Sequence, residues 1–309
     1  MHRLEAFGNS LRGVALHQSK RAGQVRVYRP PEQLVLALGD QHFDVTSRAL
    51  VMGILNRTKD SFFAPAATFE LDDFFRRAEQ LVGEGADLLD VGGVKAGPGV
   101  EVTEQEELDR VVPAIRELHR RFDLPLSIDT WRASVARACF GEGASVGNDI
   151  SGFADPDYLT VAAKAGATVV ATHIRLRPRV ADPDPQYDDV TVTVKDFLVE
   201  RRARALAAGI SADRIVLDAG LDLGKTAGQS LQLLRDSDVL AALGSPLLLS
   251  ASNKTVLGVM FDRVVTDRRE ASLDATALGI AAGCRVVRVH DVAGSVRVRD
   301  AMTRLLEVG

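Results

Sequence analysis

Short apolar runs recur along most of this chain, and a helical pattern separates each run from the next. The eight runs lie at 48–56, 86–93, 124–130, 145–151, 167–173, 214–220, 245–252 and 285–291. Most are rich in Val, Ile and Leu without polar alternation, which is typical of strands buried on both faces of a parallel sheet. Eight strand–helix repeats in about 245 residues predict an α/β fold, a (β/α)8 TIM barrel, with a doubly wound open sheet as the alternative.

The segment before the first run predicts a separate feature. Residues 1–47 contain two strand-like stretches, QVRVYRP at 24–30 and VLALGD at 35–40. We expect 1–47 to be a short N-terminal extension that caps the bottom of the barrel, which itself spans 48–309. Segment 175–190 is rich in Pro and Asp, and this composition predicts a long loop after the fifth strand.

Composition argues against several classes of partner. The formal net charge of −4 gives no support for a nucleic-acid-binding surface. No uncharged apolar run is long enough to cross a bilayer, and the N-terminus lacks the apolar core of a secretory signal. We therefore expect a cytoplasmic protein without membrane or nucleic-acid partners, in which Cys139 and Cys284 are reduced thiols.

Polar residues fall at the end of every apolar run. They are Asn56, Asp90, Asp129, Asn148 with Asp149, His173, Asp218, Lys254, and Arg288 with His290. In a barrel these strand ends converge on the C-terminal mouth, where the active sites of this fold lie. Polar residues at so many equivalent positions predict a functional site there.

Four of these residues combine carboxylates with an amide and an ammonium: Asp129, Asn148, Asp218 and Lys254. The two carboxylates suit the N–H donors of a planar heterocycle, and the amide and ammonium suit its carbonyl and ring nitrogens. A buried site of this kind is selective, because the wrong ligand leaves polar groups unpaired.

A second set of polar residues suits an anion. It consists of Asn56, Arg288 and His290, with Arg57, Lys59 and Lys95 in adjacent loops. Cations and loop amides at a barrel mouth are typical of phosphate or diphosphate sites. Three other strand-end residues remain open: Asp90 and Asp149 are equally consistent with ligand contacts or with loop ties, and His173 with a site or an interior position.

Other catalytic signatures are absent from the sequence. It has no G-x-S-x-G, H-E-x-x-H or paired C-x-x-C motif. The GKT at 224–226 lacks the glycine that a P-loop requires five positions before Gly224, where Ala219 stands. We interpret it as a loop followed by a helix start.

Six segments, in order, resemble the dihydropteroate synthase family. They are MGILNRTKDSF (52–62), GADLLDVGGVKAGPG (85–99), SIDTWRASVARACFGEGASVGNDISG (127–152), GISADRIVLDAGLDLGKT (209–226), SASNKTVLG (250–258) and RVVRVHDV (285–292). The ordered set covers about residues 48–305 and is far more specific than any single motif. The family joins 6-hydroxymethyl-dihydropterin diphosphate to p-aminobenzoate in folate biosynthesis and releases diphosphate.

This resemblance implies a role for individual residues. Asp129, Asn148, Asp218 and Lys254 match pterin-binding positions, and Ile150 would line that pocket. Asn56, Arg288 and His290 match the diphosphate site, where Asn56 also contacts Mg²⁺, and Asp60 and Phe62 match a mobile loop. Catalysis would be mainly electrostatic, with Lys254, Arg288 and His290 as the catalytic residues. The family also implies a homodimer.

The other half of the family pattern is altered. The positions that differ are Arg57 and Lys59 in the first loop, where Thr58 is kept, Val94, Lys95, Ala96 and Gly97 in the second, Ala219, Asp222 and Leu223 after strand six, and Asn253 in place of arginine. We expect a pterin-binding protein whose condensation activity is weak or lost. The alternatives are a working synthase, a transferase with a different nucleophile, and a non-catalytic partner subunit.

Overall fold

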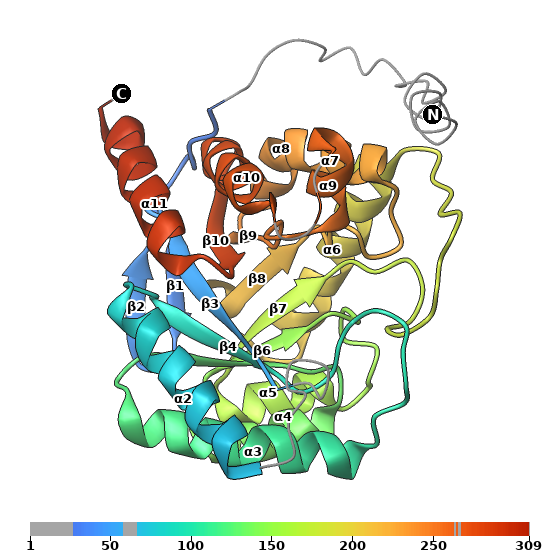
Figure 1. The fold of residues 1–309 in the computed structure, drawn as a ribbon. Coiled ribbons are helices and arrows are strands. Elements are labelled where there is room, and N and C mark those ends of the chain that lie inside the picture. Colours follow the sequence, from blue (N-terminus) through green and yellow to red (C-terminus); the bar gives the residue numbers. More distant parts are fainter. Residues whose placement is uncertain (1–26, 58–66, 263, 265–266, 309) are drawn as a thin grey trace, which may run out of the picture.

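The computed structural model describes residues 27–57, 67–262, 264 and 267–308, and its centre is a closed barrel of eight parallel strands (Figure 1). The strands are β3 (Leu50–Asn56), β4 (Leu88–Gly92), β5 (Leu126–Asp129), β6 (Val146–Asp149), β7 (Thr168–Thr172), β8 (Ile215–Asp218), β9 (Leu247–Leu249) and β10 (Cys284–Val289). β10 pairs with β3, with Val287 opposite Val51, so the sheet has no open edge. The predicted (β/α)8 barrel is confirmed, and the open-sheet alternative is wrong.

Helices surround the barrel, as Figure 1 shows. They are α2 (Ala67–Gly83), α3 (Glu104–Arg121), α4 (Ala133–Gly141), α5 (Tyr158–Ala165), α6 (Val190–Ala207), α7 (Ala227–Arg235), α8 (Ser237–Ala241), α9 (Thr255–Phe261), α10 (Arg269–Ala281) and α11 (Val292–Glu307), with a 3-10 turn at Ala212–Arg214. Side chains fix several of their starts. Thr226, in the GKT segment, forms a capping box with Gln229 at the start of α7, as expected for a helix start.

Two apolar layers stabilise this arrangement. The larger lies between the strands and the helices, where residues such as Val51, Ile115 and Leu217 are fully buried. The smaller fills the inside of the barrel with side chains that alternate along the strands, including Met52 and Val170. Because the interior is packed, only the ends of the barrel are available for a site.

A hairpin of β1 (Val35–Leu38) and β2 (Gln41–Asp44) covers one of these ends. Its Leu36 and Leu38 join the inner apolar layer, and the Thr168 hydroxyl at the start of β7 donates to the Ala37 carbonyl. The hairpin therefore lies at the N-terminal ends of the strands. Of the two predicted strands, 35–40 is confirmed in part, whereas residues 27–30 of the other are not a strand.

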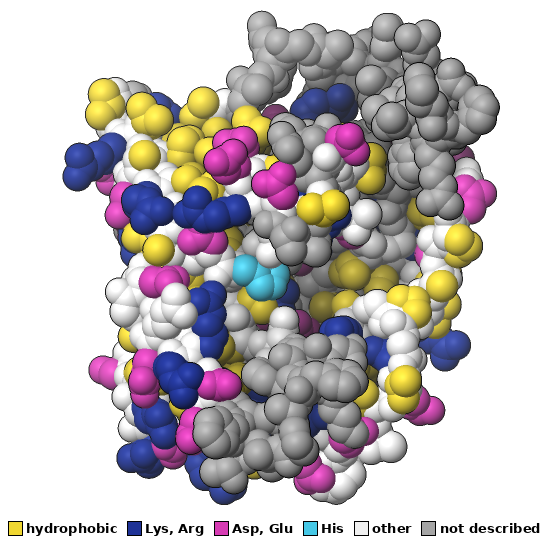
Figure 2. Space-filling view, viewed as in Figure 1, with side chains coloured by type: hydrophobic (Ala, Val, Ile, Leu, Met, Phe, Trp, Pro, Cys, Tyr) yellow, Lys and Arg dark blue, Asp and Glu magenta, His cyan; other side chains and the backbone are white. Residues whose placement is uncertain are grey.

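Three further expectations bear on partners. Cys139 and Cys284 are both buried free thiols, as expected. Among the described residues, no helix is long and apolar enough to cross a membrane. Lys and Arg are interspersed with Asp and Glu on the face that Figure 2 shows, so no single charge dominates this surface.

Candidate functional site

Polar side chains are buried at the C-terminal ends of the strands, opposite the hairpin. Asp90 is fully buried, and Asn148 and Asp218 are nearly so. The strand register makes them neighbours, because Asp90 is opposite Ser127 and Asp129 is opposite Asn148. The barrel therefore brings together residues that are far apart in sequence.

Arg288 lies at the centre of this group. Its Nε donates to Asp90 Oδ2 at 2.6 Å and its Nη2 donates to Asp129 Oδ2 at 2.8 Å. Asp90 also accepts from Ser127 Oγ at 2.5 Å and from Asn148 Nδ2 at 3.3 Å. The sequence placed Asp129 and Arg288 in separate sets, but the structure joins them in one network. Asp90, whose role was open, is a partner of Arg288.

Burial and neighbouring charges shift the protonation of this network. Burial raises the pKa of Asp129 to about 7, while the charge of Arg288 acts in the opposite direction. Burial alone would lower the pKa of Arg288, but the Asp90 and Asp129 carboxylates outweigh it and raise that pKa. Arg288 therefore remains a cation in a buried acidic site.

Asp218, at the end of β8, and Lys254, which follows β9, form a second group at the mouth. Asp218 Oδ1 accepts from Gly220 N at 2.8 Å, and Lys254 Nζ donates to the Leu221 carbonyl at 2.6 Å. Burial raises the pKa of Asp218 and lowers that of Lys254, and each charge opposes the shift of the other. This arrangement provides an acceptor and a donor for the edge of a polar ring.

Asn56 and His290 stand at the ends of β3 and β10. A Cβ added at Gly92 would lie 3.4 Å from Asn56 Oδ1 and 3.6 Å from Asp129 Cβ, so this amide borders the central network. His290 Nδ1 lies 3.0 Å from Ser252 Oγ, and burial lowers the pKa of His290 to about 4. His290 is therefore a neutral hydrogen-bonding group at neutral pH.

A magnesium ion was expected beside Asn56. No group of three or more His, Cys, Asp or Glu in the described part of the chain has the arrangement of a metal site. Mg²⁺ often takes only one or two protein oxygens and completes its shell with water and phosphate. The amide oxygen of Asn56 fits that kind of partial site.

The remaining predicted residues fall into four cases. Ile150 follows β6 and is 8% exposed. Asp149 accepts from Ser151 N and Phe153 N at 2.7 and 2.9 Å, so it ties its loop. His173 is 3% exposed and lies edge-on to Phe197, 4.8 Å between ring centroids, so it is an interior residue. Asp60 and Phe62 lie outside the described residues.

A small pocket of ≈ 140 Å³ lies at the rim of the mouth. It is formed by the loops after β4, β7 and β8, and four of its lining residues depart from the family pattern: Ala96, Gly97, Asp222 and Leu223. Asp222 Oδ2 also accepts from Thr255 N at 2.6 Å, beside Lys254. Four of the altered positions, from two different loops, therefore lie together in this pocket. We call this the rim pocket.

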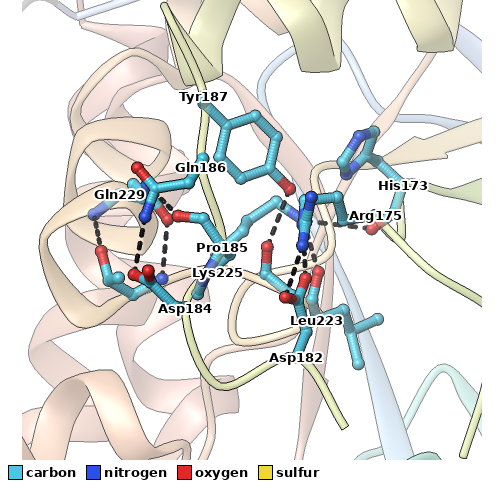
Figure 3. Close-up of polar contacts among 12 residues, drawn as sticks. His173, Arg175, Asp182, Asp184, Pro185, Gln186, Tyr187, Leu223, Lys225 and Gln229 are labelled. Carbon is cyan, nitrogen blue, oxygen red and sulfur yellow. Dashed lines mark hydrogen bonds and ion pairs between the residues drawn. The ribbon is translucent and has the colours of Figure 1, made fainter. Parts of the chain in front are cut away.

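The long loop after β7 forms one wall of the rim pocket, and its length agrees with the prediction (Figure 3). The loop is held internally by the Arg175–Asp182 ion pair and externally by the Tyr187 hydroxyl, which donates to the Gly224 carbonyl at 2.8 Å. Lys225 Nζ donates to the carbonyls of His173, Gly220 and Leu223, and burial lowers its pKa to about 7. Lys225 thus ties two loops together.

Sequence reasoning missed three contacts at the mouth. Ser127 binds Asp90, Asp222 binds the start of α9, and Arg179 Nη1 donates to the Lys95 carbonyl at 3.0 Å. Ser127 precedes Asp129 by two positions on the same strand, so their shared face was a usable signal. The other two contacts join loops, and no local pattern reveals them.

These observations define a (β/α)8 protein whose mouth holds buried carboxylates, an amide and cations. The chain belongs to the pterin binding enzyme family, whose pattern matches residues 52–290. It is dihydropteroate synthase-like along nearly its whole length.

Two known relatives support both the family assignment and the likeness to dihydropteroate synthase. The inactive dihydropteroate synthase 2 of Mycobacterium leprae is 42% identical over 264 residues, or 84% of this chain and 91% of that protein. The dihydropteroate synthase of Synechocystis is 38% identical over 287 residues, or 91% and 98%.

Solved structures agree with these sequence matches. The Yersinia pestis dihydropteroate synthase with a sulfonamide drug complex has a TM-score of 0.83 and 34% identity, covering 89% of this chain and all of that one. The Xanthomonas albilineans enzyme with 4-aminobenzoic acid has a TM-score of 0.81 and 36% identity, covering 90% and 98%.

Proposed function

We propose that this chain binds a reduced pterin at the barrel mouth and condenses it with p-aminobenzoate weakly or not at all. One observation carries this proposal: one half of the family pattern is kept in this chain, and the other half is altered. The pterin-type residues are kept at the C-terminal end of the barrel, whereas four of the altered residues line the rim pocket.

The retained half suits a pterin ring. Asp129 and Asp218 would accept its N–H groups, and Asn148 and Lys254 would meet its carbonyl and ring nitrogens. Both carboxylates lie in a largely buried setting, where an unpaired polar group costs about 1–3 kcal/mol. A ligand without the matching donors would therefore be rejected.

The altered half explains the expected loss of activity. Where the family has an arginine, Asn253 carries no charge, and one charge-assisted hydrogen bond contributes about 1.5–3 kcal/mol. Val94 to Gly97 lack the hydroxyls and the arginine of the family pattern. These changes remove groups that would hold the second substrate and the leaving diphosphate. The name of the Mycobacterium leprae relative, an inactive synthase, supports the same conclusion.

The anion half of the site would receive the diphosphate. Asn56 would hold Mg²⁺ together with diphosphate oxygens, and Arg288 and His290 would contact the same group. The metal, when bound, neutralises charge on the leaving group. Lys254 and Arg288 would supply the remaining positive charge, so any residual catalysis is electrostatic.

A related transferase with a different nucleophile is the second candidate. The rim pocket favours it, because the altered residues leave a cavity rather than filling it. Consumption of the pterin diphosphate with other amines, but not with p-aminobenzoate, would support this candidate. If no nucleophile is consumed, the chain is instead a non-catalytic pterin-binding partner subunit.

We further propose that the protein is a cytoplasmic homodimer that pairs through its last helices. Leu278 on α10 and Leu305 on α11 are 45% and 68% exposed, which is consistent with a covered surface in a dimer. Sedimentation analysis distinguishes a homodimer from a monomer. A monomer at high concentration would contradict this assignment.

Titration calorimetry with 6-hydroxymethyl-dihydropterin tests the pterin site. We expect binding by the wild type and its loss in Asp218→Ala, while Asp40→Ala, at an exposed position in the β1–β2 turn, binds normally. Binding that survives in Asp218→Ala, or no binding by the wild type, would contradict the proposal.

A diphosphate-release assay with the pterin diphosphate and p-aminobenzoate tests the reaction. We expect release at least about a hundred-fold slower than in an active family member, since roughly 3 kcal/mol of transition-state stabilisation corresponds to two decades in rate. Turnover at the rate of an active member would show that the altered loops still support condensation.

A further inference from the structure

Two carboxylates that differ in burial bind Arg288. Asp90 is fully buried and is itself fixed by Ser127 and Asn148, so its bond to Arg288 Nε belongs to the barrel framework. Asp129 ends β5 and its side chain is 15% exposed, and it binds the outer Nη2 of the guanidinium. Asp90 thus belongs to the barrel interior, and Asp129 faces the mouth.

The Asp129–Arg288 bond joins two side chains that the proposed function assigns to different ligand groups. Under the proposed function Asp129 accepts N–H groups from the pterin, and Arg288 binds the diphosphate. In the structure, these two side chains bind each other at 2.8 Å. An anion that takes Arg288 Nη2 must therefore displace Asp129 Oδ2, and a pterin N–H that takes Asp129 Oδ2 must displace Arg288 Nη2.

We propose that Asp129 and Arg288 form a ligand-responsive pair that couples the pterin half of the site to the anion half. The inference rests on the proposed function. When pterin N–H groups take the Asp129 carboxylate, Arg288 loses its Nη2 partner and keeps its Nε bond to Asp90. The guanidinium then presents its outer edge to an anion. Asp90 is a positioning residue, because it acts through Arg288.

The sign of the coupling follows from this exchange. A pterin removes the competitor for Arg288, so it strengthens anion binding, and an anion removes the competitor for Asp129. Linkage requires the two effects to be equal in size. A coupling on the order of 10-fold is typical of such two-site systems.

Titration calorimetry with inorganic pyrophosphate, with and without saturating 6-hydroxymethyl-dihydropterin, measures the coupling. In the wild type we expect pyrophosphate to bind on the order of 10-fold more tightly with the pterin present, and the pterin to gain equally from pyrophosphate. Equal affinities in the two conditions, with both ligands binding, would overturn the inference.

Asp129→Asn separates this pair from a general charge effect. It should bind pyrophosphate alone more tightly than the wild type, because Arg288 has lost its carboxylate competitor. Asp218→Asn is the matched control: it removes the same charge from the mouth, but Asp218 acts on Arg288 only through space. Its gain in pyrophosphate affinity should be much smaller.

The outcomes distinguish this inference from the proposed function. If the wild type binds no pterin, the proposed function fails and the coupling fails with it, whereas the pyrophosphate affinity of Asp129→Asn still decides whether Asp129 competes with an anion for Arg288. A gain confined to Asp129→Asn supports the pair. Equal gains in both variants, an unchanged or weaker affinity in Asp129→Asn, or no pyrophosphate binding in any of the three proteins would overturn it.

Discussion

Asn253 shows how one residue can change chemistry while leaving the fold intact. Its backbone has a φ of 59°, in the left-handed region where Asn is several-fold enriched among non-glycine residues. Its backbone N–H donates to Ser272 Oγ at 3.1 Å, and Arg268 Nη1 donates to its backbone carbonyl at 3.0 Å. The main chain is therefore well held with asparagine at this position. The proposed loss of activity therefore does not arise from a disturbed backbone at this position.

His173 leads to a prediction about pH. Burial lowers the pKa of its imidazole to about 3, whereas an unfolded chain has a histidine pKa of about 6.5. Its contribution to stability is therefore fully present above pH 6.5 and is lost as the pH falls toward 3. Between pH 7 and pH 5 the difference is about 2 kcal/mol in the free energy of unfolding.

Denaturant unfolding of the wild type and His173→Gln at both pH values measures this difference. On acidification from pH 7 to pH 5, the free energy of unfolding should fall by about 2 kcal/mol less in His173→Gln than in the wild type. His42→Gln, at an exposed position on β2, is the control and should keep the wild-type pH dependence. Equal losses in His173→Gln and the wild type would show that the buried imidazole does not resist protonation.

At the scale of elements, the strands and their polar ends were predictable, but the contacts between them were not. Strand ends such as Asp129 and Asp218 follow from apolar periodicity and from the convergence of barrel strands. The Arg288–Asp129 bond joins residues 159 positions apart in sequence. It depends on which rotamers the packed interior permits, and one sequence does not contain that information.

The loop contacts of α9 lead to the element-scale prediction. Asp222 Oδ2 accepts from Thr255 N at 2.6 Å and from Val256 N at 3.3 Å, so it caps a helix from another loop. We expect Asp222→Gly, which restores the family residue, to reduce hydrogen-exchange protection of these amides. The loss of a cap costs about 1 kcal/mol, partly offset here because glycine tolerates the φ of 65° at this position.

Asp222→Asn is the matched comparison for that change. It removes the charge but keeps a side-chain acceptor and a residue type that tolerates the left-handed backbone. Protection of Thr255 and Val256 should fall less than in Asp222→Gly. Unchanged protection in both variants would mean that the carboxylate does not hold the start of α9.

At the scale of the whole molecule, the hairpin and the mouth lie at opposite ends of one packed barrel. Leu36 is 1% exposed and shares the inner apolar layer with Met52, Val170 and Val286. That layer continues along the strands toward the residues that bind Arg288. The stability of the mouth should therefore depend on packing at the far end.

Leu36→Ala tests this dependence. Removing a buried leucine side chain costs about 2–5 kcal/mol, because a cavity remains where the surroundings do not relax. Trp131, the single tryptophan, follows β5 at the mouth, so its fluorescence reports on the end farthest from the change. We expect the unfolding midpoint from Trp131 to fall together with that from circular dichroism.

Val27→Ala, at a 57% exposed position, should leave both midpoints near those of the wild type. If the Trp131 midpoint in Leu36→Ala stays at the wild-type value, the hairpin stabilises only its own end, and the two ends of the barrel unfold separately.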